Sequence, residues 1–203
     1  MEENVKRMRV WALLLVAIGA ACSNDSTGPK PGDTVGPTQL HIVRQDAAAP
    51  QLQAYAASFW AVKGTSRTLE IDYLGGEDFF RLDVPGDALL RRPDGSTIQQ
   101  GDSVLISVEI DPSLMLFRFE PGGLMFDGAH PVRLRVDYSN ADDDFDEDGD
   151  VDTDDDAIEG TWLSVWRQPA SGTNWVRLAS ARDASLEDFE AELVQFSNYA
   201  LAW

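Results

Sequence analysis

Residues 132–138 read VRLRVDY, a segment in which every second side chain is apolar. Successive side chains of a β-strand point to opposite faces, so such a segment covers a core with one face and meets water with the other. The same period of two occurs in LEIDY at 69–73 and in VLISVEI at 104–110. These three segments predict half-buried strands.

Shorter apolar runs extend this pattern over the chain from residue 39 onward. Further strands are expected at 39–44, 53–63, 79–84, 114–120, 161–167, 174–179, 189–196 and 199–203. The gaps between them contain Gly-Gly, Pro-Gly-Asp, Pro-Asp-Gly and Pro-Gly-Gly, which are typical of turns. No window of a dozen residues in this region follows the 3.6-residue period of a helix. About ten short strands predict an all-β fold, an antiparallel sandwich or barrel, and we take the β-sandwich as the fold class.

Composition restricts the classes of protein to consider. The chain has 203 residues, enough for one domain, and is 43% hydrophobic, which supplies a core and excludes wholesale disorder. With 16 basic and 35 acidic residues its formal charge is −19, so its surface repels phosphate and nucleic acid is excluded as a partner. A single cysteine excludes an internal disulfide framework and a multi-cysteine zinc site.

The first 21 residues have the organisation of a secretory signal peptide. Lys6, Arg7 and Arg9 precede an apolar run at 10–21. A basic flank followed by about a dozen apolar residues and small residues before the break is typical of an export signal. The run is too short to span a membrane, which takes about 20 residues. We predict a signal peptide at 1–21.

The residues that end this segment resemble the lipobox of bacterial lipoproteins. Gly19-Ala20-Ala21-Cys22 carries the only cysteine of the chain where a lipid anchor would be attached, although that box usually has Leu in place of Gly19. The resemblance implies lipidation of Cys22 and a place in the cell envelope. With Ser23 after the cysteine, it implies the outer membrane in a Gram-negative host. Ordinary cleavage, which leaves a secreted or periplasmic protein, is the alternative.

Residues 22–38 are rich in Gly, Pro, Ser and Thr and carry few apolar side chains. Such a segment cannot bury itself, so a flexible tether is expected there. The β-sandwich domain is then expected at 39–203.

Five segments together resemble the ZU-five domain, a β-sandwich shared by zonula occludens scaffolds, netrin receptors and ankyrins and found in bacterial surface proteins. They are FRLDVPGDAL at 80–89, FEPGGLMF at 119–126, PVRL at 131–134, WVRL at 175–178 and QFSNYAL at 195–201. The resemblance covers about residues 69–203. It implies a two-sheet fold and a scaffolding or binding role without a catalytic residue.

Some ZU-five domains cut themselves at a His-Phe-Ser tripeptide. Here the corresponding residues are Gln195, Phe196 and Ser197. The amide of glutamine cannot accept the serine proton at neutral pH, so the nucleophile lacks its base. We expect no self-cleavage, and Ser197 is expected to be an ordinary residue at the end of a strand.

An acidic insertion at 141–160 carries twelve acidic residues and no basic one. A solvated loop without an ion is one interpretation. The internal spacing D-x-D-x-D-G, with Gly149 at its sixth position, favours a calcium loop of the EF-hand type, and it also resembles one half of a dockerin. The candidate ligands are Asp144, Asp146, Asp148, Asp150 (through its carbonyl), Asp152 and Asp155.

The insertion departs from the EF-hand pattern in ways that matter for affinity. Asp155 replaces the usual Glu at the twelfth position and is shorter, and no flanking helices are evident. Val151, at the eighth position, is expected to pin the loop to the protein. We predict calcium as a weakly bound cofactor, in the extracellular range of about 10⁻⁴–10⁻³ M.

The chain carries no recognisable catalytic motif. Nucleophile elbows, zinc-binding HExxH helices and glycine-rich phosphate loops are absent from the sequence, and His41 and His130 are expected to be structural or surface residues. The function predicted is a membrane-anchored, non-catalytic extracytoplasmic module that binds an envelope or extracellular protein or glycan. The alternative is a secreted, glycosidase-like hydrolase with an unrecognised pair of carboxylates.

Overall fold

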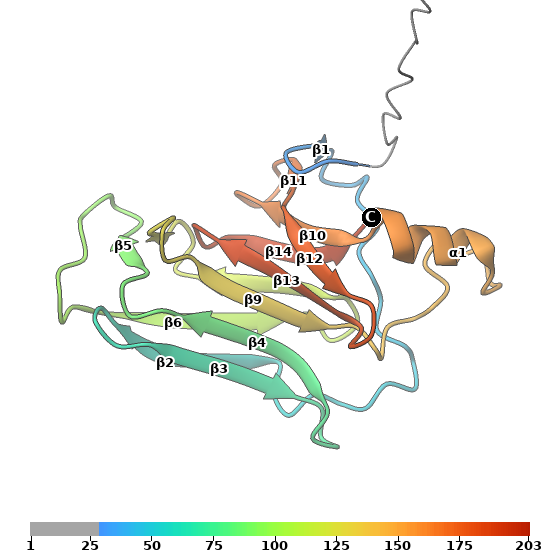
Figure 1. Cartoon of the computed structure of the whole chain (residues 1–203), viewed down its shortest axis with the longest axis horizontal. Coiled ribbons are helices and arrows are strands. Elements are labelled where there is room, and N and C mark those ends of the chain that lie inside the picture. Colours follow the sequence, from blue (N-terminus) through green and yellow to red (C-terminus); the bar gives the residue numbers. More distant parts are fainter. Residues whose placement is uncertain (1–28) are drawn as a thin grey trace, which may run out of the picture.

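The alternating segments form the strands of two packed antiparallel sheets (Figure 1). A computed structural model describes residues 29–203; the predicted signal peptide and Cys22 lie outside the described residues. One sheet contains β1 (Thr34–Val35), β2 (Ala56–Val62), β6 (Ser103–Ile110), β7 (Leu116–Glu120), β10 (Ser164–Gln168), β11 (Trp175–Arg177) and β14 (Asn198–Ala202). The other contains β3 (Arg67–Asp72), β4 (Asp78–Val84), β9 (Val132–Asp137), β12 (Ser180–Asp183) and β13 (Asp188–Leu193).

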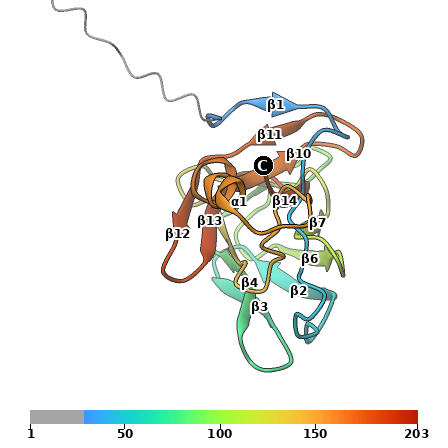
Figure 2. The ribbon, with the colours of Figure 1, turned by 90° about the vertical axis from the view of Figure 1, so that its right-hand side faces the viewer.

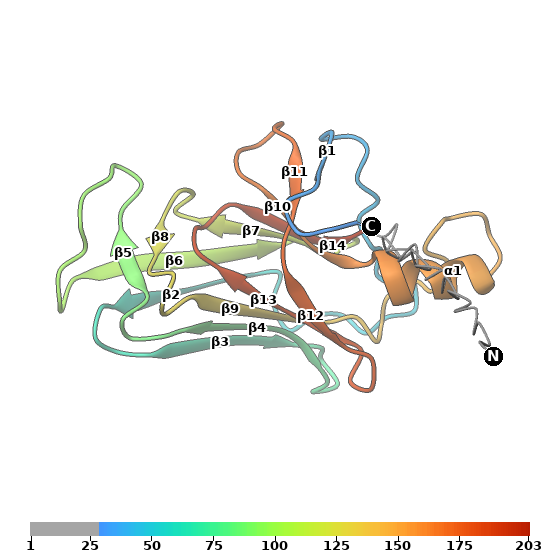
Figure 3. The ribbon, with the colours of Figure 1, turned by 45° about the horizontal axis from the view of Figure 1, so that its top comes forward.

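The strand order shows which segments lie side by side. The seven-stranded sheet runs β1-β11-β10-β14-β7-β6-β2, and the five-stranded sheet runs β12-β13-β9-β4-β3. A small third sheet pairs β5 (Leu89–Arg91) with β8 (Met125–Phe126) at one end of the sandwich, as Figure 3 shows. The predicted all-β antiparallel sandwich is confirmed.

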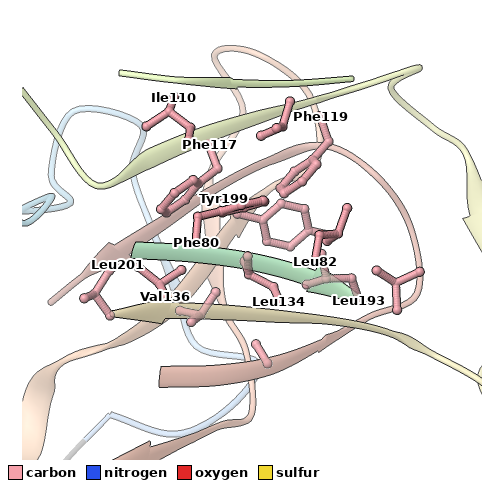
Figure 4. Packing of buried hydrophobic residues seen from close by; sticks show 14 of the residues in the cluster. Phe80, Leu82, Ile110, Phe117, Phe119, Leu134, Val136, Leu193, Tyr199 and Leu201 are labelled. Carbon is pink, nitrogen blue, oxygen red and sulfur yellow. The ribbon is translucent and has the colours of Figure 1, made fainter. Parts of the chain in front are cut away.

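Aromatic rings from both sheets meet in the core (Figure 4). Phe80 of β4 stacks on Phe117 of β7 with 5.5 Å between ring centroids. Phe119 stacks on Phe196 at 4.8 Å, and Phe126 meets Phe196 edge-on at 4.7 Å. Each of these rings is almost fully buried, and burying one contributes about 1.5–3 kcal/mol. Phenylalanine contacts therefore join the two sheets within a core that is otherwise largely aliphatic.

The expected tether is shorter than predicted, because its last residues belong to the sheet. Thr34 and Val35 form β1, which pairs with Val176 and Trp175 of β11. Val35 packs against a second apolar cluster on the outer face of the seven-stranded sheet, where Trp166 and Trp175 are buried. The gain from covering two tryptophans outweighs the polar composition of this segment.

Several local predictions also need correction. Residues 39–44 make only isolated bridges, Ile42 with Ala202 and Arg44 with Leu114, instead of a regular strand. The strands β5, β8 and β12 were not expected, because two of them are only two or three residues long and β12 reads SARD. A helix was not expected either, yet α1 (Thr153–Ala157) continues into a π-helix, η1 (Ile158–Trp162). Ten residues are too few to show a helical period. Among the described residues, the helices are too short and too polar to span a membrane.

Replacing Phe117 tests the packing between the sheets. Phe117→Ala removes a fully buried ring, so the free energy of unfolding should fall by about 3–5 kcal/mol in urea titrations. Leu186→Ala, at a side chain that is 54% exposed, is the control and should change it by less than about 0.5 kcal/mol. Equal effects of the two substitutions would contradict this account of the core.

Candidate metal centre

The acidic insertion connects β9 to β10 and lies at the end of the sandwich that carries α1 (Figure 2). Its strongest geometric feature is a cluster of three carboxylates. Asp144, Asp146 and Asp148 each offer one oxygen, and these oxygens lie within 4.8 Å of one another. Calcium binds oxygen at 2.3–2.6 Å, so two ligands of one ion are at most about 5 Å apart. The spacing of these oxygens is therefore close to that of ligands that share one calcium ion.

Backbone amides hold these carboxylates in place. The two oxygens of Asp144 accept hydrogen bonds from the amides of Asp148 and Gly149, both at 3.0 Å. Asp148 accepts one from the amide of Asp150, also at 3.0 Å. Gly149 has φ +97°, a left-handed conformation that glycine adopts without strain. The predicted sharp turn at this position is present.

Asp155 occupies the twelfth position of the loop but has a different role from the predicted one. Its side chain is buried, with 3% exposure, and lies outside the carboxylate cluster. One oxygen accepts the amides of Phe145 at 2.7 Å and Asp146 at 3.3 Å, while the other accepts the amide of Asp152 at 2.9 Å. These hydrogen bonds, that from Asp152 foremost, lower the pKa of Asp155. Asp155 thus joins the two ends of the loop.

The carboxylates of Asp150 and Asp152 also lie outside the cluster. Asp152 is the N-cap of α1, and its carboxylate accepts the amide of Asp154 at 2.8 Å. Of the five ligands predicted through their side chains, the structure brings three together. Asp152 and Asp155 instead form a capping box that starts the helix.

The apolar contact that fixes the loop was assigned to the wrong residue. Val151 is 67% exposed and does not pin the loop to the protein. Phe145 and Ile158 are buried in the main core instead, and Trp203 donates a hydrogen bond from its indole nitrogen to the Phe145 carbonyl at 3.1 Å. A phenylalanine inside an otherwise acidic run was the signal in the sequence that pointed to this contact.

The electrostatics of the insertion favour a cation. Partial desolvation and the neighbouring carboxylates of Asp148, Asp155 and Asp144 raise the pKa of Asp146. Desolvation likewise raises the pKa of Asp143, with Glu159 and Asp142 adding to it. A raised pKa means that the ionised form is unfavourable, first because of desolvation and then because the like charges repel one another. A bound divalent cation would relieve this repulsion.

Sequence reasoning missed a polar network that ties the end of the insertion to the five-stranded sheet. Tyr138 donates a hydrogen bond to Glu159 at 3.0 Å, and Arg182 of β12 donates one to the Tyr138 hydroxyl at 2.6 Å. Arg182 also forms an ion pair with Glu159. Burial is the main cause that raises the pKa of Tyr138, to about 12, so the phenol stays protonated and donates. The network fixes η1 against β12.

A second acidic group lies on the outer face of the five-stranded sheet. Asp137, Asp188 and Asp183 are direct cross-strand neighbours on β9, β13 and β12. Arg135 forms an ion pair with Asp188 at 2.6 Å. Burial, with Asp188 and Asp78 nearby, raises the pKa of Asp137. The cavity beside Asp137 measures about 40 Å³, whereas ligand pockets measure about 300–1,000 Å³, so it does not fit a sugar.

The remaining candidate residues have structural surroundings. His41 stacks on Trp203 with 4.4 Å between ring centroids, and His130 lies on the surface 3.4 Å from an Asp127 oxygen. Phe196 is fully buried in the core, and the Ser197 hydroxyl lies 3.4 Å from the Asn198 carbonyl.

Comparisons of the chain with family models, with curated proteins and with solved structures found no match. Function is therefore argued from the geometry of the site and from the sequence.

Asp155→Asn tests the role of Asp155. The asparagine side chain has one acceptor oxygen, and its amide nitrogen is a donor. It therefore cannot accept hydrogen bonds from the amides at both ends of the loop. The Phe145 or the Asp152 amide should exchange at least about tenfold faster in hydrogen-exchange measurements. Because the pKa of Asp155 is lowered in the fold, its contribution is present above pH about 4 and is lost as the pH falls through the lowered value. Asp154→Asn is the control, and unchanged protection in Asp155→Asn would refute the role.

Asp137→Asn tests the group of cross-strand aspartates formed by Asp137, Asp188 and Asp183. A raised pKa means that the ionised carboxylate lowers the stability of the fold above that pKa, and that this cost disappears as the pH falls below about 4. The variant keeps an acceptor for Ser139, so at pH 7 it should gain about 0.2–1 kcal/mol, and at pH 3 it should match the parent. The measurement is thermal unfolding across pH with exposed Asp87→Asn as control; equal gains from both would exclude a local effect.

Proposed function

We propose that this protein is a lipid-anchored, non-catalytic binding module of the cell envelope whose acidic insertion holds a calcium ion. The observation that supports the calcium site best is the approach of the Asp144, Asp146 and Asp148 oxygens to within 4.8 Å of one another. The donor set consists only of oxygens, which suits calcium or magnesium and disfavours zinc or copper. The long loop with backbone-held carboxylates suits the larger and more flexible calcium shell.

Calcium would act here as a structural ion. Asp144, Asp146 and Asp148 would hold it, with the Asp150 carbonyl and water completing the six to eight oxygens that calcium takes. Asp155 would support the loop from behind by its backbone hydrogen bonds. Neutralising the cluster would stabilise the connection between β9 and β10, and so the end of the sandwich.

The anchor and the binding role rest on the sequence. Cys22 in its lipobox-like setting supports attachment to a membrane, the outer membrane in a Gram-negative host, and the ZU-five resemblance supports a scaffold that holds an envelope protein or glycan. A glycosidase would need two carboxylates in a cleft that takes a sugar. The raised pKa of Asp137 is of the right kind, but the cavity beside it is too small for a sugar, so Asp137 is not proposed as a glycosidase residue.

Calcium titration tests the proposed site. With a dissociation constant of about 10⁻⁴–10⁻³ M, 10 mM calcium should raise the stability of the protein by about 1.4–2.7 kcal/mol, seen as a higher melting temperature and as heat in calorimetry. The double substitution Asp144→Asn and Asp148→Asn should abolish both signals. Asp156→Asn, an equally acidic position of α1 outside the cluster, should keep them. Absence of heat and of a melting shift in the parent protein would overturn the calcium site.

A further inference from the structure

The edges of the two large sheets differ sharply in how they are protected. An open edge presents unpaired backbone groups, which proteins usually protect with short strands, charged side chains or bulges. The edge strand β1 has two residues, β12 carries Arg182 and Asp183, and β3 carries Arg67 and Glu70 and has a bulge at its end. Three of the four edges therefore follow this rule.

The fourth edge, β2, is unprotected. Its seven residues read AASFWAV, without a charge, a proline or a glycine, and all seven pair in regular register with β6. Within residues 29–203, no strand pairs with its other side. Figure 1 shows β2 beside β3 at the lower border of the sandwich. β2 is thus a long, regular edge that can accept another strand.

Both faces of β2 leave apolar surface partly uncovered. On the inner face, Ala57 and Phe59 pack against the main core but remain partly exposed. On the outer face, Trp60 is 58% exposed and lies opposite Leu105 of β6, which is 47% exposed. A strand added to β2 would place its inward side chains beside Phe59 and its outward side chains beside Trp60.

Charge indicates what kind of strand fits. Toward the start of β2, a hollow of about 340 Å³ is lined by small residues such as Ser58 and Ser107. Glu109 and Glu120 border it. Glu109 also forms an ion pair with Arg118 at 3.7 Å, and together with Glu120 it supplies local negative charge that attracts a cationic segment. The charge of −19 on the chain opposes association with a second copy. A lysine or arginine beside Trp60 would also gain a cation–π contact.

We propose that β2 is the partner-binding edge of this protein and that it takes an extended cationic segment as an added strand. The segment alternates apolar residues, which cover Phe59, with lysine or arginine, which face Trp60 and Glu109. The proposal rests on the proposed function in one respect, since it names the partner class of the binding module. It does not depend on calcium.

A nine-residue Lys-Val repeat peptide, labelled for fluorescence anisotropy, probes this edge. The parent protein should bind it, with backbone NMR shifts at 56–62. Trp60→Lys puts a positive charge on the edge and removes the cation–π partner, so binding should weaken at least about tenfold. Leu74→Lys changes charge equally at another exposed apolar residue, in the β3–β4 connection and outside β2, and should bind within about twofold of the parent.

Further arms separate strand addition from simple charge attraction. A Lys-Pro repeat of the same charge lacks half of the backbone donors and should bind at least about tenfold more weakly than the Lys-Val repeat. Equal binding of the two peptides, or equal effects of Trp60→Lys and Leu74→Lys, overturns the proposal. The proposal is also overturned if the parent chain is a dimer in sedimentation and Trp60→Lys converts it to a monomer. Calcium titration of the same samples reports on the metal site separately, so a protein that binds calcium but not the peptide refutes the edge alone.

Discussion

The stacking of Phe80 on Phe117 joins the two sheets, and the rest of the structure depends on this packing. Since side chains alternate along a strand, the buried positions fix the register of every strand that faces the core. A shift of one residue in β7 would turn Phe117 and Phe119 to water and Arg118 to the core. The outer faces, with their charged rows and edges, are consequences of this constraint.

The acidic insertion depends on the same core. Its carboxylates repel one another, yet Phe145 and Ile158 bury apolar surface among the strands and Trp203 binds the Phe145 carbonyl. The loop can therefore keep Asp144, Asp146 and Asp148 close together because its two ends are fixed by packing and by Asp155. Repulsion among the carboxylates is offset by the burial of Phe145 and Ile158 from the same insertion.

The sequence predicted those features that follow from strictly local patterns. Alternation found the long strands such as β6 and β9, and the D-x-D-x-D-G spacing named the three aspartates that lie together. It did not predict β12, whose polar residues lie at an edge where only backbone pairing defines the strand. Nor did spacing reveal that Asp155 turns inward, because its partners are backbone amides, which the residue types do not encode.

The strand order also separates the calcium loop from the β2 edge. The loop follows β9 of one sheet and leads into β10 of the other. Among residues 29–203, β2 pairs only with β6, at the far end of the seven-stranded sheet. Between β10 and β2 lie β14, β7 and β6, all anchored in the phenylalanine core. Energetic coupling between two sites needs an element between them that can adopt two arrangements. Close packing of β14, β7 and β6 disfavours a second arrangement of these strands. Calcium is thus better suited to stabilise the end of the sandwich than to switch the edge on and off.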